Sequence, residues 1–322
     1  MELVFDIEAN GLGEITIDRK LNEEVNKVWC LVAKDLLTGK IYSYREDKIA
    51  EGVSLLRKAT KLVGHNIIMY DLPVLERFYG KIHTPAVDTL VISKLMYPDI
   101  RNHPLKGNSL KCWGESLGES KIDYDGGFDS FTEEMLTYCI QDVEVSEKIY
   151  KAQQEYISSN SKVVRLELMV TSIIAKQIEN GMGFNIKAAE LLEHELLMEK
   201  AGMEDKLCRE FEPIVTERWS EKTGKRLKDS VEQFNPNSRQ QIAKRLSNKY
   251  GWTPSLTDKG NPRVDEAILN KLDYPEAKLL LRCFEITKLH GMLSDWIVRA
   301  DNSRDKRIHG SINPQGAVTG RM

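Results

Sequence analysis

The spacing of apolar residues changes near residue 130, and this change constrains the fold more than any other feature of the sequence. Before that point, short apolar runs of strand length alternate with stretches of helical spacing. Strands are predicted at 2–9, 27–34, 40–44 and 62–65, and helices at 48–60, at 70–79, after residue 88 and from Ser109 onward. Because strands that alternate with helices form layered structures, we predict an α/β domain built on a mixed sheet.

Beyond residue 130 the spacing is helical almost throughout. Ser130 and Glu133 match the capping-box pattern, which predicts a helix from there to residue 150. The polar stretch 222–234 is predicted to be a loop or a hairpin. Further helices are predicted at 162–181, 186–211, 238–250 and 265–296. We therefore expect two domains, 1–158 and 159–322, of which the second is mainly helical.

Composition argues against several classes of protein. The chain of 322 residues has no run of about 18 apolar residues, and its N-terminus lacks the basic and apolar segments of a signal peptide. We therefore expect no contact with membranes and a cytoplasmic location, which is the host cytoplasm if a phage encodes the chain. The five cysteines are scattered without a Cys-x-x-Cys pair, so we expect reduced thiols and neither a zinc ribbon nor a redox motif.

The net charge of −3 gives no sign of nucleic-acid binding by itself. The charge is uneven, however, because residues 217–249 hold nine Lys or Arg against four Asp or Glu. Basic stretches in one part of a chain and buried acids in another suit a protein that grips a polyanion and holds cations. A solvated helix face would show the same charge run, so composition leaves both interpretations open.

The run Phe5-Asp6-Ile7-Glu8 in the first predicted strand gives the strongest chemical signal. Side chains alternate along a strand, so Asp6 and Glu8 share one face, while Leu3, Phe5 and Ile7 share the other and can enter the core. Two carboxylates on one face of a central strand repel each other and are tolerated if they share a cation. An Asp-x-Glu pair also recurs by chance, so the pair alone does not establish a metal site.

Two further motifs carry carboxylates. Asp71 stands at the start of a short predicted helix, after the run Gly64-His65-Asn66, where a helix-capping role would also explain it. Tyr138 and Asp142 are four residues apart on a predicted helix, so the phenol and the carboxylate project together. A surface-facing pair would show the same spacing.

The three motifs in this order resemble the DEDDy branch of the DnaQ-like 3′→5′ exonucleases: Asp-x-Glu in the first strand, Asn-x-x-x-Tyr-Asp, then Tyr-x-x-x-Asp on a late helix. By this resemblance the sheet is ribonuclease H-like, and Tyr138 helps to orient the attacking water. His65 is a weaker candidate for a base, because the second motif places Asp71 at the metals. The residues that the resemblance assigns to two divalent ions are Asp6, Glu8, Asp71 and Asp142.

These residue types suit phosphodiester hydrolysis, which must activate a water and stabilise charge on the leaving 3′ oxygen. Two metal ions about 3.5–4 Å apart can do both. Hard oxygen ligands select Mg²⁺ or Mn²⁺ over zinc. Tyr138 has a phenol with an ordinary pKa of about 10, so it suits positioning water better than acting as a base. The sequence therefore predicts a metal-dependent 3′→5′ DNA exonuclease that proofreads single-stranded or frayed 3′ ends.

The second half resembles the thumb of family A DNA polymerases. The resemblance rests on Phe234-Asn235-Pro236-Asn237-Ser238 before a basic helix, on 257–262, and on the terminal run 308–321, which is closest to replicative polymerases of T-odd podophages. It implies contact with the backbone of primer–template DNA, for which Lys, Arg and Ser side chains are suited. Taken singly, each candidate is as easily explained as solvated surface. The candidates for DNA contact are Ser238, Arg239, Lys244, Arg245, His309 and Arg321.

The sequence departs from this resemblance in two places. A short polar stretch replaces the long thumb insertion that recruits thioredoxin in the best-known podophage enzyme, so thioredoxin is not expected as a partner. The chain also ends before palm and fingers, so we expect no polymerase active site in it and a separate palm–fingers chain as its partner. Two rival functions stay open: an RNA 3′ exonuclease on the same scaffold, and a DNA-gripping subunit of a two-chain polymerase with incidental nuclease activity.

Overall fold

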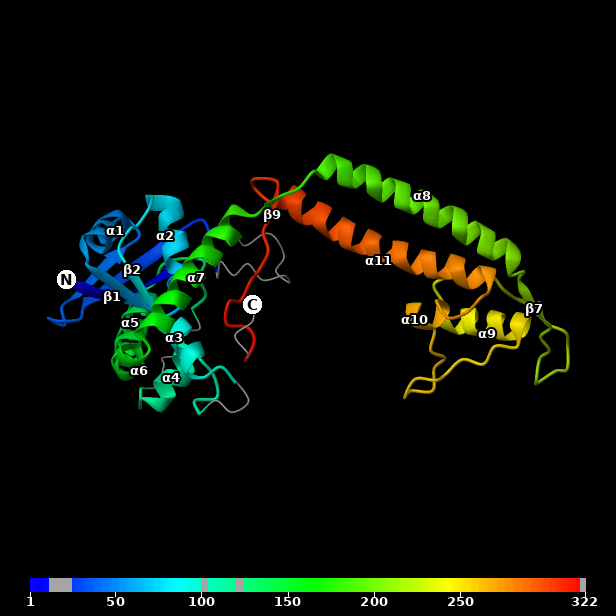
Figure 1. The fold of residues 1–322 in the computed structure, drawn as a ribbon, viewed down its shortest axis with the longest axis horizontal. Helices are drawn as coiled ribbons and strands as arrows, with labels where there is room; N and C mark the ends of the chain where they lie inside the picture. The colour runs from blue at the N-terminus through cyan, green and yellow to red at the C-terminus, as the bar shows by residue number, and fades with distance from the viewer. Residues whose placement is uncertain (12–24, 100–103, 120–123, 125, 319–322) are drawn as a thin grey trace. The chain divides into compact units, whose positions relative to one another are not determined.

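The computed structural model describes residues 1–11, 25–99, 104–119, 124 and 126–318. The chain divides into two compact units, which are residues 1–182 with 309–322, and residues 183–308. Each unit buries an apolar core of its own. Figure 1 shows a layered arrangement of strands and helices in the first unit and long helices in the second.

The first unit is built on a five-stranded sheet (Figure 1). The strand order is β3-β2-β1-β4-β5, with β1 in the centre. Neighbouring strands are antiparallel from β3 to β1 and parallel from β1 to β5, so the predicted mixed α/β fold is confirmed. The strands are β1 (Glu2–Ala9), β2 (Val28–Asp35), β3 (Ile41–Arg45), β4 (Lys61–Gly64) and β5 (Ala86–Asp88).

Alternate residues of β1 enter two different cores, one on each face of the sheet. The odd-numbered residues from Leu3 to Ile7 pack with α1 (Ile49–Lys58) and α2 (Asp71–Tyr79), as their alternation predicts. Val4 packs on the opposite face against α5 (Glu133–Ala152). Because side chains two residues apart share a face, Asp6 and Glu8 are on the side of the sheet that α5 covers.

Four further helices are seen among the described residues of the first unit, and one of them, α7, moves the domain boundary. α7 packs through Leu168 and Ala175 against the core that α1 and α2 share. The first unit therefore extends to residue 182, whereas the sequence places the boundary at residue 158. These helices are α3 (Thr89–Met96), α4 (Leu110–Ser116), α6 (Gln154–Ser159) and α7 (Ser161–Asn180).

The second unit is mainly helical, as predicted. Its two long helices, α8 (Ile186–Glu210) and α11 (Pro275–Asn302), run side by side, and α9 (Arg239–Tyr250) and α10 (Glu266–Leu269) share their core (Figure 1). Between α8 and α9, the strands β7 (Ile214–Thr216) and β8 (Ser230–Glu232) form a hairpin. A second two-stranded pair consists of β6 (Met182–Gly183) and β9 (Arg307–Ile308).

Two helix predictions are wrong in detail. The helix α5 is capped by Thr132, whose hydroxyl accepts a hydrogen bond from the Met135 N–H at 3.0 Å, and not by Ser130. The helix predicted at 265–296 is in fact two helices, α10 and α11. Pro275 begins α11, and a proline disfavours helical backbone at the residue before it, which here is Tyr274.

Two expectations from composition can be compared directly with the structure. All five cysteines are free, as predicted. Within the described ranges, no helix has the length and apolar character that a membrane span needs.

Candidate active site

The site begins on the face of β1 that α5 covers. Asp6 and Glu8 are each 8% exposed there. Their carboxylates and the Cys139 thiol can each place a donor atom within 4.8 Å of the other two. The Cys139 thiol donates to the main-chain oxygen and to a carboxylate oxygen of Asp6, both at 3.6 Å. Because buried like charges at this separation are costly, the donor set fits a divalent cation that would compensate them.

Asp71 joins this cluster from α2. It is the first residue of that helix, is 2% exposed, and accepts a hydrogen bond from the Ile7 N–H at 3.1 Å. Ile7 stands between Asp6 and Glu8, so this bond ties the third carboxylate to the backbone that carries the first two. The helix-capping alternative does not hold, because Tyr70 is the N-cap and no side chain caps α2.

The helix α5 brings the third motif to the same place. Asp142 is 4% exposed, and its charge acts on Asp71. Cys139, one turn earlier, touches Asp6, so this face of α5 is turned toward β1. The ring of Tyr138 is half-buried and lies 5.6 Å from the ring of Tyr124. The Tyr138–Asp142 spacing therefore does not mark a surface pair.

Burial dominates the electrostatics of the cluster. It raises the pKa of Asp71 to about 8. The hydrogen bond from the Ile7 N–H opposes this rise, and the charges of Asp88 and Asp142 add smaller contributions to it. Burial likewise raises the pKa of Asp88 and that of the Cys139 thiol. Without a cation, the protein therefore disfavours negative charge at this site. Binding of a divalent cation would be coupled to loss of protons from it.

Two residues of this region were not predicted as site residues. Cys139 contributes a sulfur donor beside the carboxylates, and its place between Tyr138 and Asp142 was the available signal. Asp88 is completely buried near Asp71, and its place directly before a predicted helix was the signal for a cap. The His65 ring nitrogen Nδ1 lies 2.9 Å from the Thr89 hydroxyl, which fits a structural role.

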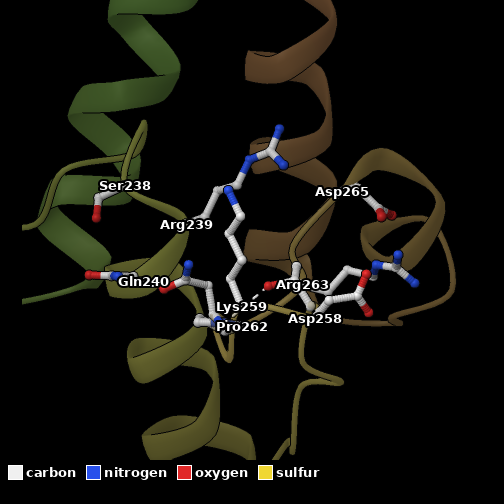
Figure 2. A pocket seen from close by; sticks show the side chains of 10 residues that line it. Ser238, Arg239, Gln240, Asp258, Lys259, Pro262, Arg263 and Asp265 are labelled. Atoms are coloured by element: carbon white, nitrogen blue, oxygen red, sulfur yellow. Dashed lines mark hydrogen bonds between the residues drawn. The ribbon is translucent and has the colours of Figure 1, made fainter.

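A pocket of about 720 Å³ in the second unit gathers two of the predicted DNA contacts (Figure 2). Ser238 caps α9 by accepting a hydrogen bond from Gln241, and Arg239 begins that helix. Figure 2 shows Lys259 reaching across the pocket beside Arg239. Cations at a helix start suit phosphate groups. The pocket is lined by Ser238, Arg239, Gln240, Thr257, Asp258, Lys259, Asn261, Pro262, Arg263 and Asp265.

Lys244 and Arg245 are neighbours on α9 with different surroundings. Lys244 is exposed and forms an ion pair with Glu232 at 3.2 Å. Arg245 is 8% exposed, and its guanidinium donates to the main-chain oxygens of Glu212 and Glu232 at 2.7 and 3.3 Å. This placement gives Arg245 a structural role in place of the predicted DNA contact.

The last two predicted DNA contacts lie elsewhere in the chain. His309 belongs to the first unit, where its Nδ1 lies 2.8 Å from the main-chain oxygen of Ile178. Arg321 lies outside the described residues. Of the four candidates on and before α9, Ser238 and Arg239 line the pocket, and Lys244 and Arg245 do not.

The fold and the buried cluster together define a class. The chain is an α/β unit with a carboxylate site suited to divalent cations, joined to a mainly helical unit that carries a partly basic pocket.

The known proteins that this chain is similar to are DNA polymerases. Residues 205–322 match the family model described as DNA polymerase family A. The chain is 27% identical to the DNA-directed DNA polymerases of Enterobacteria phage T3 and Escherichia phage T7, over 99% of its own length and 61% of theirs. It is 24% identical to DNA polymerase I of Pseudomonas aeruginosa, over 83% of this chain and 29% of that protein.

A solved structure supports the fold. The POL domain of Pol1 from M. smegmatis, in complex with DNA primer-template and dNTP, matches with a TM-score of 0.63 at 16% identity, over 92% of this chain and 48% of that one. The resemblance to phage family A DNA polymerases is thus confirmed, and the chain spans about three fifths of the length of its phage relatives. We predicted that the chain lacks a polymerase active site. The match to the polymerase family model does not support this, and it stays a prediction.

Proposed function

We propose that this chain is a metal-dependent 3′→5′ exodeoxyribonuclease that proofreads during DNA replication. The observation that carries the proposal is the convergence of Asp6, Glu8, Asp71 and Asp142, from one strand and two helices, at a buried place. Four buried carboxylates in one region are energetically costly unless cations compensate their charge. The strand order around β1 supports a ribonuclease H-like sheet.

The proposed reaction is hydrolysis of the last phosphodiester. A water oxygen bonds to phosphorus, the bond to the 3′ oxygen breaks, and that oxygen takes a proton to leave a new 3′-hydroxyl end and a nucleoside 5′-monophosphate. Two Mg²⁺ or Mn²⁺ ions would supply Lewis acidity to the attacking and leaving oxygens. The carboxylates of Asp6, Glu8, Asp71 and Asp142 would hold them. The Tyr138 hydroxyl would orient the water by a hydrogen bond, since tyrosine hydroxyls are in general weak bases for this step.

The second unit would hold primer–template DNA. Ser238 and Arg239 at the start of α9 support this, together with the basic residues Lys259 and Arg263 across the same pocket. Family A polymerase relatives point the same way. Primer extension would also require a palm and fingers, supplied by a separate chain or by a continuation of this one, and thioredoxin would not be required.

The match of residues 205–322 to a polymerase family model favours a second candidate function. In it, the chain is the DNA-gripping part of a polymerase, and its nuclease activity is incidental. A nuclease assay separates the two, because proofreading requires that a mismatched 3′ end be removed faster than it is extended.

The test combines a double substitution with metal removal. Asp6→Ala with Glu8→Ala should abolish digestion of a 3′-labelled single strand in Mg²⁺, because the ligands on β1 are lost. Chelation by EDTA should stop the wild-type protein, and zinc alone should support little activity, since hard oxygen donors favour Mg²⁺ or Mn²⁺.

The matched control removes the same number of charges elsewhere in the first unit. Asp47→Ala with Glu51→Ala changes two exposed carboxylates and should leave the rate within about twofold of wild type, in the range of neutral surface substitutions. A double variant at Asp6 and Glu8 that keeps activity within tenfold of wild type would overturn the assignment. Thermal unfolding of both variants shows that each is folded.

A further inference from the structure

A buried carboxylate that takes no part in the proposed chemistry stands beside the site. Asp88 ends β5, is 0% exposed and caps α3. Both of its oxygens are occupied by main-chain N–H groups. Since a carboxylate filled in this way has little capacity left for a cation, Asp88 is not suited to be a metal ligand.

The N–H groups that Asp88 binds come from two different segments. Two belong to the first turn of α3, Leu90 and Val91, at 2.9 and 3.4 Å from Oδ1. The other two belong to the turn after β4: Asn66 donates to Oδ1 at 2.9 Å and Ile68 donates to Oδ2 at 3.0 Å. One side chain thus fastens the turn after β4 to the start of α3.

That turn leads directly into α2 and its first residue, Asp71. The N–H of Leu72 donates to the main-chain oxygen of Ile67 at 2.9 Å, and the N–H of Tyr70 donates to that of Asn66 at 3.1 Å. Asn66 adopts a φ of 68°, in the left-handed region that is uncommon for residues other than glycine, although asparagine enters it more readily than most. The backbone before Asp71 is therefore held in an uncommon conformation, which needs support from its surroundings.

A second set of contacts supports the same turn. The Thr89 hydroxyl donates to the main-chain oxygen of Gly64 at 3.1 Å and lies 2.9 Å from Nδ1 of His65. The side chain of Gln153 donates to the main-chain oxygen of Thr89 at 3.0 Å. Asp88 and Thr89 therefore hold the end of β4 and the turn that follows it, and this turn leads to Asp71.

We propose that Asp88 is a positioning residue for Asp71, which it holds beside Asp6 and Glu8 by fixing the turn from Asn66 to Tyr70. This inference rests on the proposed metal-dependent nuclease. Asp88 acts through the backbone, so its loss weakens metal binding more than it slows the reaction once metal is saturating. A residue that serves only the stability of the fold would not show this difference.

The test is Asp88→Asn, with metal binding measured apart from catalysis. The asparagine keeps one acceptor oxygen, but its amide nitrogen cannot accept a hydrogen bond. Either the bond from the Ile68 N–H or the three bonds at Oδ1 are therefore lost. Calorimetric titration of Mn²⁺ into the full chain without DNA measures the binding. The variant should bind Mn²⁺ at least about 10-fold more weakly than the wild type, in the range seen when groups that orient metal ligands are mutated. The Mg²⁺ concentration for half-maximal digestion should rise by a similar factor, and saturating Mg²⁺ should restore most of the rate.

Asp35 provides a matched control. It is 7% exposed in the same unit, and its Oδ1 accepts hydrogen bonds from the N–H groups of Leu37 and Thr38 at 2.8 and 3.0 Å in the turn after β2. Asp35→Asn makes the same change of charge at another buried carboxylate that accepts main-chain N–H groups, although its amide oxygen can keep both bonds. It should lower the unfolding temperature but leave Mn²⁺ affinity within about twofold, because Asp35 pairs with Leu3, three residues along β1 from Asp6, and holds no segment that carries a metal ligand.

Equal Mn²⁺ affinity in the Asp88→Asn and Asp35→Asn variants would overturn the inference and leave Asp88 a structural cap. If Asp88→Asn does not fold, Thr89→Val tests the same turn, and unchanged Mn²⁺ affinity there also counts against the inference. A wild-type chain that neither binds Mn²⁺ nor digests DNA contradicts the proposed function itself, so the two failures are distinguishable.

Discussion

At the scale of single residues, the site consists of carboxylates whose burial disfavours their ionised form. Asp6, Glu8, Asp71 and Asp142 are each at most 8% exposed, and burial raises the pKa of Asp71 to about 8. Such residues are poor contributors to stability, because an ionised buried carboxylate costs several kcal/mol unless it is compensated, on the order of 1.4 kcal/mol for each pKa unit. A bound cation would remove this unfavourable free energy, so the same buried charges would favour binding of a metal ion.

Tyr138 is the residue at which positioning can be separated from acid–base catalysis. Tyr138→Phe removes one hydroxyl and keeps the ring that packs against Tyr124. We expect the single-turnover rate to fall by about 10- to 1000-fold, comparable to losing one well-placed hydrogen bond at the transition state. The rate should keep the pH dependence of the wild type, because a group that only positions the water neither gains nor loses a proton in the reaction.

Tyr150→Phe is the control for this substitution. It makes the same change on the same helix, at a hydroxyl 3.4 Å from Nζ of Lys61, and should leave the rate nearly unchanged. A Tyr138→Phe variant that turns over like the wild type would remove Tyr138 from the site.

At the scale of elements, α9 shows how neighbouring residues on one helix take different roles. Buried Arg245 ties α9 to both ends of the β7–β8 hairpin through the main-chain oxygens of Glu212 and Glu232, whereas Lys244 is exposed. A helix that presents an apolar face to its core places successive residues in different surroundings, since each residue turns about 100° from the last. The charge run that suggested DNA binding therefore mixes surface and structural cations.

This contrast gives a prediction for the pair. Arg245→Met should lower the free energy of unfolding by about 1–2 kcal/mol, because two main-chain acceptors lose charged donors. Lys244→Met should change it by less than about 0.5 kcal/mol, as is usual for an exposed ion pair. Chemical denaturation of the two variants measures the difference. Equal losses of stability would show that the buried hydrogen bonds of Arg245 are not what holds the hairpin to α9.

At the scale of the whole molecule, the proposed nuclease and DNA-holding regions lie in different compact units. A 3′ end that enters the nuclease must first leave the duplex, and unstacking costs about 1.4 kcal/mol per step. Freeing about three pairs costs roughly 4 kcal/mol, which corresponds to about a thousandfold in population. Single strands and mismatched 3′ ends should therefore be digested much faster than matched duplex.

The measurement uses three substrates with one shared labelled strand: the strand alone, the matched duplex, and a duplex with three terminal mismatches. The matched duplex is expected to be slowest, and its disadvantage should shrink as temperature rises and fraying increases. Equal initial rates on all three would show that strand separation does not control access to the site.

Local rules determined much of this protein from sequence alone. The alternation in Glu2–Ala9 predicted both the strand and the shared face of Asp6 and Glu8, because period two is a property of the extended backbone. Helix spacing predicted α7, α8 and α9 to within about two residues, the usual uncertainty of helix ends. Glycine and proline act through their own dihedrals: Gly80 follows α2 with a φ of 81°, and Pro275 begins α11, which helical spacing alone had merged with α10.

Tertiary structure decided what each of these residues touches. Nothing local distinguishes Asp71 as a helix cap from Asp71 bonded to Ile7, which is 64 positions away, because that bond exists only once α2 has packed beside β1. The same holds for Arg245. Its sequence context suggests a surface cation, but in the folded chain it donates hydrogen bonds to main-chain oxygens of the β7–β8 hairpin and of the residue two before it. Sequence spacing fixes which way a side chain points along its own strand or helix, but its burial and partners depend on contacts between distant segments, and these form only in the folded chain.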